Sequence, residues 1–169
     1  MKTRSMAFVA VSAAIIGVLA QVTVPMPSGV PITLQTLGVA LVGFVLGVRR
    51  GAVACGLYIA MGAVGMPVFS GFRGGVTELL SPTGGFIFGF LLLCVACGVR
   101  AEERINTWVV PAAGLLACHL LGVLWFWFVT GTGIGVAAIT VSLPYIIKDA
   151  VCIAVARVAA KRLKRVVRI

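Results

Sequence analysis

Cationic residues alternate with long apolar stretches along this chain, and this alternation constrains the fold more than any other feature of the sequence. Apart from Arg73 and Lys148, the 14 lysines and arginines lie at the chain ends or at every second break between apolar stretches, with Arg157 counted beside the C-terminal end. Apolar stretches of about 20 residues span the roughly 30 Å hydrocarbon core of a bilayer, and cationic residues collect on its cytoplasmic side. The pattern therefore predicts an integral membrane protein and indicates which breaks face the cytoplasm.

The composition excludes an ordinary soluble domain. Hydrophobic residues make up 61% of the chain and charged residues 11%, whereas a typical soluble domain has about 25% charged residues. The net charge of +10 does not indicate nucleic-acid binding, because the cationic residues adjoin apolar stretches and are not interleaved with exposed aromatic residues. The first apolar stretch follows Lys2 and Arg4 as in a signal peptide, but five further stretches follow it, so we expect a retained helix.

We expect an all-α membrane protein in which the single domain 1–169 forms a bundle of six transmembrane helices. The expected helices are 6–22, 32–48, 51–66, 84–99, 108–129 and 138–160. Proline and glycine interrupt the chain at 24–31 and in an outer loop at 67–83, which we expect to form loops or half-inserted segments. The charge pattern places both termini, the Arg49–Arg50 turn and the 100–104 turn in the cytoplasm. The expected location is a bacterial plasma membrane, crossed several times.

Two adjacent charged residues interrupt the last apolar stretch. Lys148 and Asp149 lie about a third of the way in from its outer end, where a charge costs on the order of 3 kcal/mol to insert and normally faces the protein interior or a wet cavity. Neighbouring residues on a helix point about 100° apart, so we expect that the two do not form one tight pair. Asp149 either ties this helix to a neighbour through hydrogen bonds or belongs to a binding site.

Further polar groups on the outer half suit a small, partly apolar anion. Arg73 stands among glycines in the outer loop, Gln35 and Thr36 begin the second helix, and Tyr145 precedes Lys148 by one turn. An arginine can hold a carboxylate through two parallel hydrogen bonds, while Asp149 can accept hydrogen bonds from N–H groups of the same ligand. The alternative role of Gln35 and Thr36 is hydrogen bonding between helices.

Other motifs have simpler interpretations. Cys94 and Cys97 form a Cys-x-x-Cys pair without the second pair or nearby histidine that a zinc site requires, and His119 is the sole histidine, which we expect to be packed and hydrogen-bonded in the core. We expect neither a metal nor a cofactor. Ala10 and Ala14 form a small-xxx-small pair that allows close approach of another helix, within the bundle or in a partner. The sequence contains no phosphate-binding Gly-x-x-x-x-Gly-Lys loop.

Three motifs resemble those of the BioY family, the biotin-specific S components of energy-coupling-factor (ECF) transporters. They are PITLQT at 31–36, GMPVF at 65–69 and SPTGGFIFGF at 81–90. The resemblance extends over about residues 21–160. It implies a six-helix bundle that captures biotin from the outer side and associates with a transmembrane coupling subunit and two cytoplasmic ATPases. The resemblance also implies that Ala10 and Ala14 contact the coupling subunit.

The resemblance assigns roles to the charged residues Arg73, Lys148 and Asp149. It leaves open which of the two cations binds the carboxylate of biotin. Asp149 matches the acidic residue of the family's last helix, whereas Cys152 stands where the family has lysine. We expect Arg73 or Lys148 to neutralise the biotin carboxylate, and Asp149 and Gln35 to address the ureido ring. The alternatives are an S component for another vitamin, an intramembrane hydrolase or transferase with a nucleophile and a base in mutual reach, and a purely structural membrane subunit. The expected partners are the lipid bilayer, biotin and the ECF subunits, and no nucleic acid is expected.

Overall fold

A computed structural model describes residues 3–27, 29–99 and 108–166 of the chain, and it is mostly helical. The elements in chain order are α1 (Thr3–Gln21), β1 (Thr23–Val24), β2 (Ile32–Thr33), α2 (Gln35–Ala63), α3 (Val76–Leu80), α4 (Gly84–Val99), α5 (Val109–Thr130), α6 (Ile134–Val141) and α7 (Leu143–Val166). Helices suit such apolar sequences because they satisfy their own backbone hydrogen bonds, which lipid cannot do.

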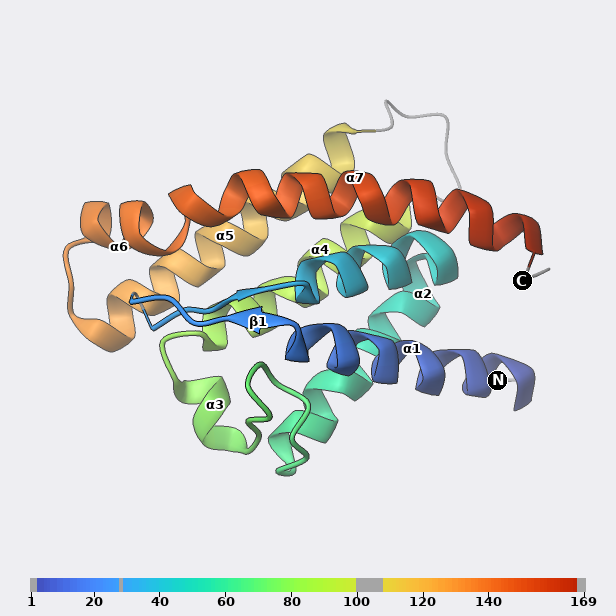
Figure 1. The fold of residues 1–169 in the computed structure, drawn as a ribbon, viewed down its shortest axis with the longest axis horizontal. Coiled ribbons are helices and arrows are strands. Elements are labelled where there is room, and N and C mark those ends of the chain that lie inside the picture. The colour runs from blue at the N-terminus through green and yellow to red at the C-terminus, as the bar shows by residue number, and fades with distance from the viewer. Residues whose placement is uncertain (1–2, 28, 100–107, 167–169) are drawn as a thin grey trace.

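The long helices lie side by side, with α2 packed against α1, α4 and α7, and α4 packed against α5 (Figure 1). The N-terminal end of α1 and the C-terminal end of α7 lie at the same end of the molecule. The hairpin of β1 and β2, the short helix α3, and α6 lie towards the other end. The segments that interrupt the apolar stretches at this second end therefore converge on one region.

A reversal at Gly47 divides α2 into two halves that run in opposite directions (Figure 1). Gly47 has φ 76° and ψ −177°, a backbone region that is essentially restricted to glycine. A Cβ placed on Gly51 would lie 3.4 Å from the Cα of Gly43, whereas eight residues of continuous helix would rise about 12 Å. The exposed Arg49 and Arg50 follow the reversal directly. The sequence thus predicted the break between its second and third helices, although α2 begins at Gln35, after a strand.

The last expected helix, 138–160, differs most from the structure. It is replaced by two helices, α6 and α7, which meet at Ser142 with a bend of 43°. Pro144 is the second residue of α7. Proline lacks the backbone N–H of the helical hydrogen-bond ladder, and its ring clashes with the carbonyl four residues earlier, so an undisturbed helix through this position is unfavourable. The helical region also begins at Ile134, four residues before the expected start.

Two of the connections at the end away from the termini have defined structure. The first is an antiparallel hairpin in which Thr23 pairs with Thr33 and Val24 with Ile32. The second, residues 67–83, contains α3 and a bridge between Phe69 and Arg73. Neither is a membrane-spanning helix, in agreement with the interruptions expected from proline and glycine.

Small residues allow the central helices to approach closely. A Cβ on Gly43 would lie 2.9 Å from the Cβ of Cys97, and one on Gly89 would lie 2.9 Å from the Cα of Cys118. Contacts this short leave room only for hydrogen, as is typical of helix packing in membranes. All five cysteines are buried with free thiols. Cys94 and Cys97 thus pack against α2, and within the described ranges no group of three or more metal-binding side chains occurs.

Three of the described helices, α1, α2 and α5, are long and apolar enough to cross a membrane by length and composition, although the reversal at Gly47 divides α2 into two shorter halves. A fourth crossing results if the bent pair of α6 and α7 counts as one span, and α4 is a shorter apolar helix. These helices support the prediction of a membrane protein.

Candidate ligand-binding site

A cavity opens between the hairpin, the 67–83 connection and the helices α2, α4, α5, α6 and α7. It has about 670 Å³ of empty volume, part of which is open solvent. Its apolar wall includes Phe69, Phe86, Ile87, Phe90, Leu115 and Val141. Its polar groups include Thr33, Gln35, Thr36, Glu78, Thr83, Tyr145, Lys148 and Asp149. An apolar cavity with a few converging polar groups is the usual form of a small-molecule site.

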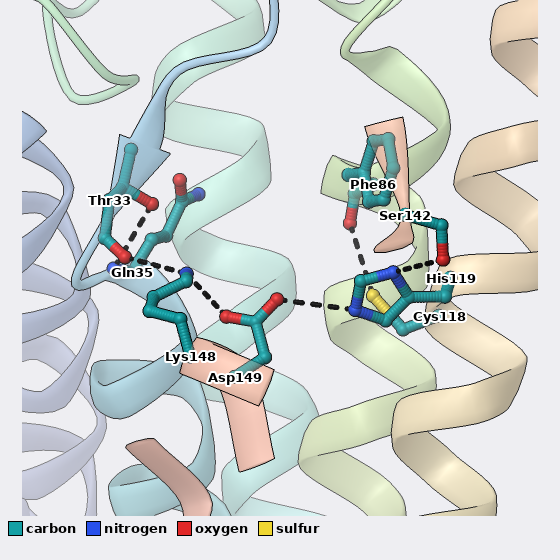
Figure 2. Close-up of polar contacts among 8 residues, drawn as sticks. All are labelled: Thr33, Gln35, Phe86, Cys118, His119, Ser142, Lys148 and Asp149. Atoms are coloured by element: carbon teal, nitrogen blue, oxygen red, sulfur yellow. Dashed lines mark hydrogen bonds and ion pairs between the residues drawn. The ribbon is translucent and has the colours of Figure 1, made fainter. Parts of the chain in front are cut away.

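Lys148 and Asp149 form an ion pair at this cavity (Figure 2). The expectation that the 100° between neighbouring residues prevents a tight pair is therefore wrong. The four-carbon stem of lysine is long and flexible enough to bring the ammonium group across that angle. Lys148 Nζ also donates a hydrogen bond to the carbonyl oxygen of Thr33 at 2.9 Å, which ties α7 to the hairpin. The lysine thus holds two acceptors from distant parts of the chain.

His119 and Ser142 continue this polar network behind Asp149. His119 Nε2 lies 3.2 Å from Asp149 Oδ2, and Ser142 Oγ lies 2.9 Å from His119 Nδ1 (Figure 2). His119 is buried, with 4% of its surface exposed, and it is hydrogen-bonded as the sequence predicted.

A serine, a histidine and an aspartate in mutual reach are the feature that would favour a hydrolase. Among the described residues that line the cavity, however, neither Ser142 nor His119 is found. A nucleophile must face the space that holds its substrate. His119 therefore contacts Asp149 on the side away from the cavity, and Ser142 is not presented to a ligand.

Gln35, Thr36 and Tyr145 lie where the sequence predicted polar groups. Gln35 and Thr36 are buried at the start of α2, and Gln35 Nε2 donates to the hydroxyl of Tyr58 at 2.6 Å. The hydroxyl of Tyr145 donates to the carbonyl oxygen of Val30. All three predicted residues line the cavity, and Gln35 and Tyr145 also join distant parts of the chain.

Arg73 takes a different position from the other predicted site residues. Its side chain is 45% exposed, pairs with Glu78 at 3.5 Å and donates from Nε to the carbonyl oxygen of Ser70. Glu78 lines the cavity, whereas Arg73 is not found among the described lining residues. Arg73 thus lies at the rim of the cavity and is connected to it through Glu78.

Sequence reasoning did not select several polar groups of the cavity and its surroundings. Glu78, Thr83 and Tyr58 were not among the predicted site residues. The sequence carried one usable signal near Ser142, namely Pro144, because proline is favoured in the first turn of a helix. Nothing local marks Tyr58, because its role follows from a contact with Gln35 across two halves of α2.

Ala10 and Ala14 lie away from the cavity on the exposed face of α1. Val11, Ile15 and Val18 on the same helix are also exposed, at 59%, 38% and 67%. Within the described chain this face is apolar and uncovered, so the two alanines do not serve packing inside the bundle.

Comparisons with known proteins agree with this architecture. The sequence model of the BioY family matches residues 1–169. A probable biotin transporter BioY from Pyrococcus horikoshii is 38% identical over 165 residues, covering 97% of this chain and 98% of the relative. A biotin transporter BioY from Thermotoga maritima is 37% identical over 155 residues, covering 90% of each.

A solved structure shares the fold. It is the crystal structure of the S-component for biotin from an ECF-type ABC transporter, with a TM-score of 0.87, 24% sequence identity and coverage of 97% of this chain and 92% of that one. The family match over the full length, and relatives similar over nearly their whole length, lead to one conclusion. This chain is a member of the BioY family.

Proposed function

We propose that this protein is a biotin-capturing S component of an ECF-type transporter and has no enzymatic activity of its own. The observation that carries the proposal is the Lys148–Asp149 pair, which faces an apolar cavity in a member of a family whose relatives are named biotin transporters. Biotin combines a polar ureido ring, an apolar ring and chain, and a carboxylate. A cavity that binds it needs hydrogen-bonding groups at one place and an apolar wall beside them.

The ion pair complements the ureido ring. A urea group presents a carbonyl acceptor beside an N–H donor, and Lys148 and Asp149 present a donor beside an acceptor. Lys148 would donate to the ureido oxygen, while Asp149 would accept from a ureido nitrogen with Gln35 nearby. Thr36 and Tyr145 complete the polar lining. Phe86, Phe90 and other apolar residues would cover the remainder of the ring.

The carboxylate is then left for the rim of the cavity, where Arg73 pairs with the lining residue Glu78. Arg73 would exchange part of its contact with Glu78 for the ligand. This assignment places the two cations at opposite ends of biotin. Cys152 occupies the position at which the family has a lysine, and Lys148 is not a simple replacement for that lysine.

The proposed topology is a single multi-pass membrane domain with six crossings and both termini in the cytoplasm of a bacterial cell. Its supports are the reversal at Gly47 and the common end of the α1 and α7 termini (Figure 1). The exposed Arg49 and Arg50 follow the reversal, and Lys161, Arg162, Lys164 and Arg165 close α7. The 100–104 turn, the second cationic break, lies outside the described residues.

Transport would require a transmembrane coupling subunit and two cytoplasmic ATPases, with the α1 face as the contact surface. The exposed Ala10 and Ala14 allow a partner helix to approach closely. Ala14→Trp should prevent co-purification with the coupling subunit and leave biotin binding intact. Ala113→Trp on α5, another exposed alanine, is the matched control and should assemble normally. Equal assembly of the two variants would contradict this surface.

Titration of the purified protein with radiolabelled biotin tests the function itself. We expect saturable binding that excess unlabelled biotin displaces and that thiamine and riboflavin do not. If thiamine or riboflavin binds as well as biotin does, the protein is an S component for another vitamin. If none of the three binds, the capture role is wrong.

A further inference from the structure

The carboxylate of Asp149 is held from both sides within a buried network. One oxygen pairs with Lys148, and the other lies 3.2 Å from His119 Nε2. The side chains of Asp149 and His119 are 9% and 5% exposed. An ionised carboxylate has about four acceptor sites, so these two partners orient the group and still leave acceptor capacity towards the cavity that Asp149 lines.

The neighbours of His119 determine which of its nitrogens carries the proton. Opposite an ionised carboxylate, Nε2 must donate, and Nδ1 of the neutral ring is then an acceptor. The Ser142 hydroxyl lies 2.9 Å from Nδ1 and can supply that hydrogen bond. Phe86 stands edge-on to the imidazole at a centroid distance of 5.8 Å, which further restricts the ring. These contacts restrict the orientation of the ring and favour the tautomer that carries its proton on Nε2.

The break between α6 and α7 brings Ser142 to the imidazole. Ser142 is the residue between the two helices, which meet at 43°. It precedes Asp149 by seven residues, and both contact the single histidine of α5 (Figure 2). Ser142 and Asp149, which lie in one chain segment, thus contact both nitrogens of the His119 ring.

We infer that His119, with its tautomer set by Ser142, is a positioning residue that fixes the Asp149 carboxylate for the N–H group of the ligand. The inference rests on the proposed function, because the ligand is the biotin of the preceding section. His119 does not touch the ligand in this arrangement, since it is not found among the described residues that line the cavity. Its effect on affinity passes through Asp149.

Two pairs of variants test the inference in the full-length purified protein. His119→Leu removes the donor, whereas His119→Gln replaces it, because the glutamine Nε2 is the same number of bonds from Cβ as the imidazole Nε2. Ser142→Ala removes the partner of Nδ1, and Ser142→Thr retains a hydroxyl. Biotin affinity is measured by titration, and the fold of each variant is checked by gel filtration and thermal unfolding.

We expect His119→Leu to weaken biotin binding at least about tenfold and His119→Gln to stay within about threefold of the wild type, as expected for loss or retention of a hydrogen bond to a charged group. Ser142→Ala should fall between wild type and His119→Leu, and Ser142→Thr should match the wild type. Wild-type affinity in His119→Leu, or equal losses in the leucine and glutamine variants, would overturn the inference. If His119→Leu does not fold, the Ser142 pair decides in the same way.

A double-mutant cycle separates positioning from general packing. In the background of Asp149→Asn, His119→Leu should change biotin affinity by less than about twofold, because the residue through which it acts has been altered. Full additivity of the two losses would overturn the inference and leave the proposed function standing. Absence of biotin binding by the wild-type protein would instead overturn both.

Discussion

The guanidinium of Arg73 and the carboxylate of Glu78 lie 3.5 Å apart at the rim of the cavity, and Glu78 is the partner that lines it. The pair lies in the 67–83 connection, where the bridge between Phe69 and Arg73 and α3 form a small ordered unit. A ligand carboxylate at the rim would compete with Glu78 for the arginine. Arg73 and Lys148 can therefore be distinguished by experiment, because only the cation that holds the carboxylate should respond to its removal from the ligand.

Arg73→Ala should weaken biotin binding by about fivefold, because a half-exposed ion pair contributes on the order of 1 kcal/mol. It should hardly affect biotinamide, which lacks the carboxylate charge. Titration with both ligands measures the difference. Arg49→Ala, at the reversal of α2, is the control and should bind both ligands like the wild type. If Arg73→Ala weakens biotin and biotinamide equally, Arg73 does not hold the carboxylate.

Lys148→Met should weaken biotin and biotinamide to the same extent, by at least about tenfold, since its proposed partner is the ureido oxygen that both share. It also leaves Asp149 buried beside His119 without its cation, and breaking a buried pair costs about 3–5 kcal/mol of stability. Thermal unfolding and titration report the two effects separately. A selective loss of biotin over biotinamide would move the carboxylate contact from Arg73 to Lys148.

Gly47→Ala should destabilise the protein by about 1–3 kcal/mol, because alanine does not tolerate the backbone conformation at φ 76° and ψ −177°. Gly56→Ala in the same helix is the matched control, since a Cβ at Gly56 meets nothing within 4 Å. Alanine at Gly56 should be neutral or stabilising by up to about 1 kcal/mol. The measurement is thermal unfolding in detergent. Similar unfolding temperatures for the two variants would show that α2 does not depend on glycine at its reversal.

Gln21→Leu should loosen the start of the 67–83 connection. The Gln21 amide donates to the carbonyl oxygens of Val68 and Phe69 at 3.3 and 3.1 Å, and its oxygen accepts from the backbone N–H of Phe72 at 2.8 Å. Phe72 has φ 57°, a conformation that costs a non-glycine residue about 1–2 kcal/mol and needs such support.

Amide hydrogen exchange measures this effect. The Phe72 amide should exchange about fivefold faster in Gln21→Leu, in keeping with the loss of a hydrogen bond worth about 1 kcal/mol. Thr130→Val removes another side-chain bond to a backbone carbonyl, the one to Phe126, and should leave Phe72 unchanged. Unaltered exchange at Phe72 in Gln21→Leu would show that the Gln21 hydrogen bonds do not stabilise this segment.

Much of the helical organisation could be predicted from the sequence, because hydropathy and helix interruption are local properties. The expected helix 84–99 has the same bounds as α4, and the break between the second and third helices falls near Gly47. The bend at Ser142 was missed although Pro144 signals it, since continuous hydropathy outweighed a single proline. The tight pair of Lys148 and Asp149 was missed because helical geometry was applied to Cβ directions and not to the reach of a lysine side chain.

The sequence by itself determined that this chain is a helical membrane protein of the BioY family and that Asp149 is an unusual charge within an apolar stretch. Only the tertiary structure decided what that charge meets. His119 lies 30 residues from Asp149 in sequence and Thr33 lies 115 from Lys148, so their contacts depend on how α5, α7 and the hairpin pack. Hydropathy and charge are carried by each residue, whereas the partners of a side chain are set by helix packing over distances that no local pattern encodes.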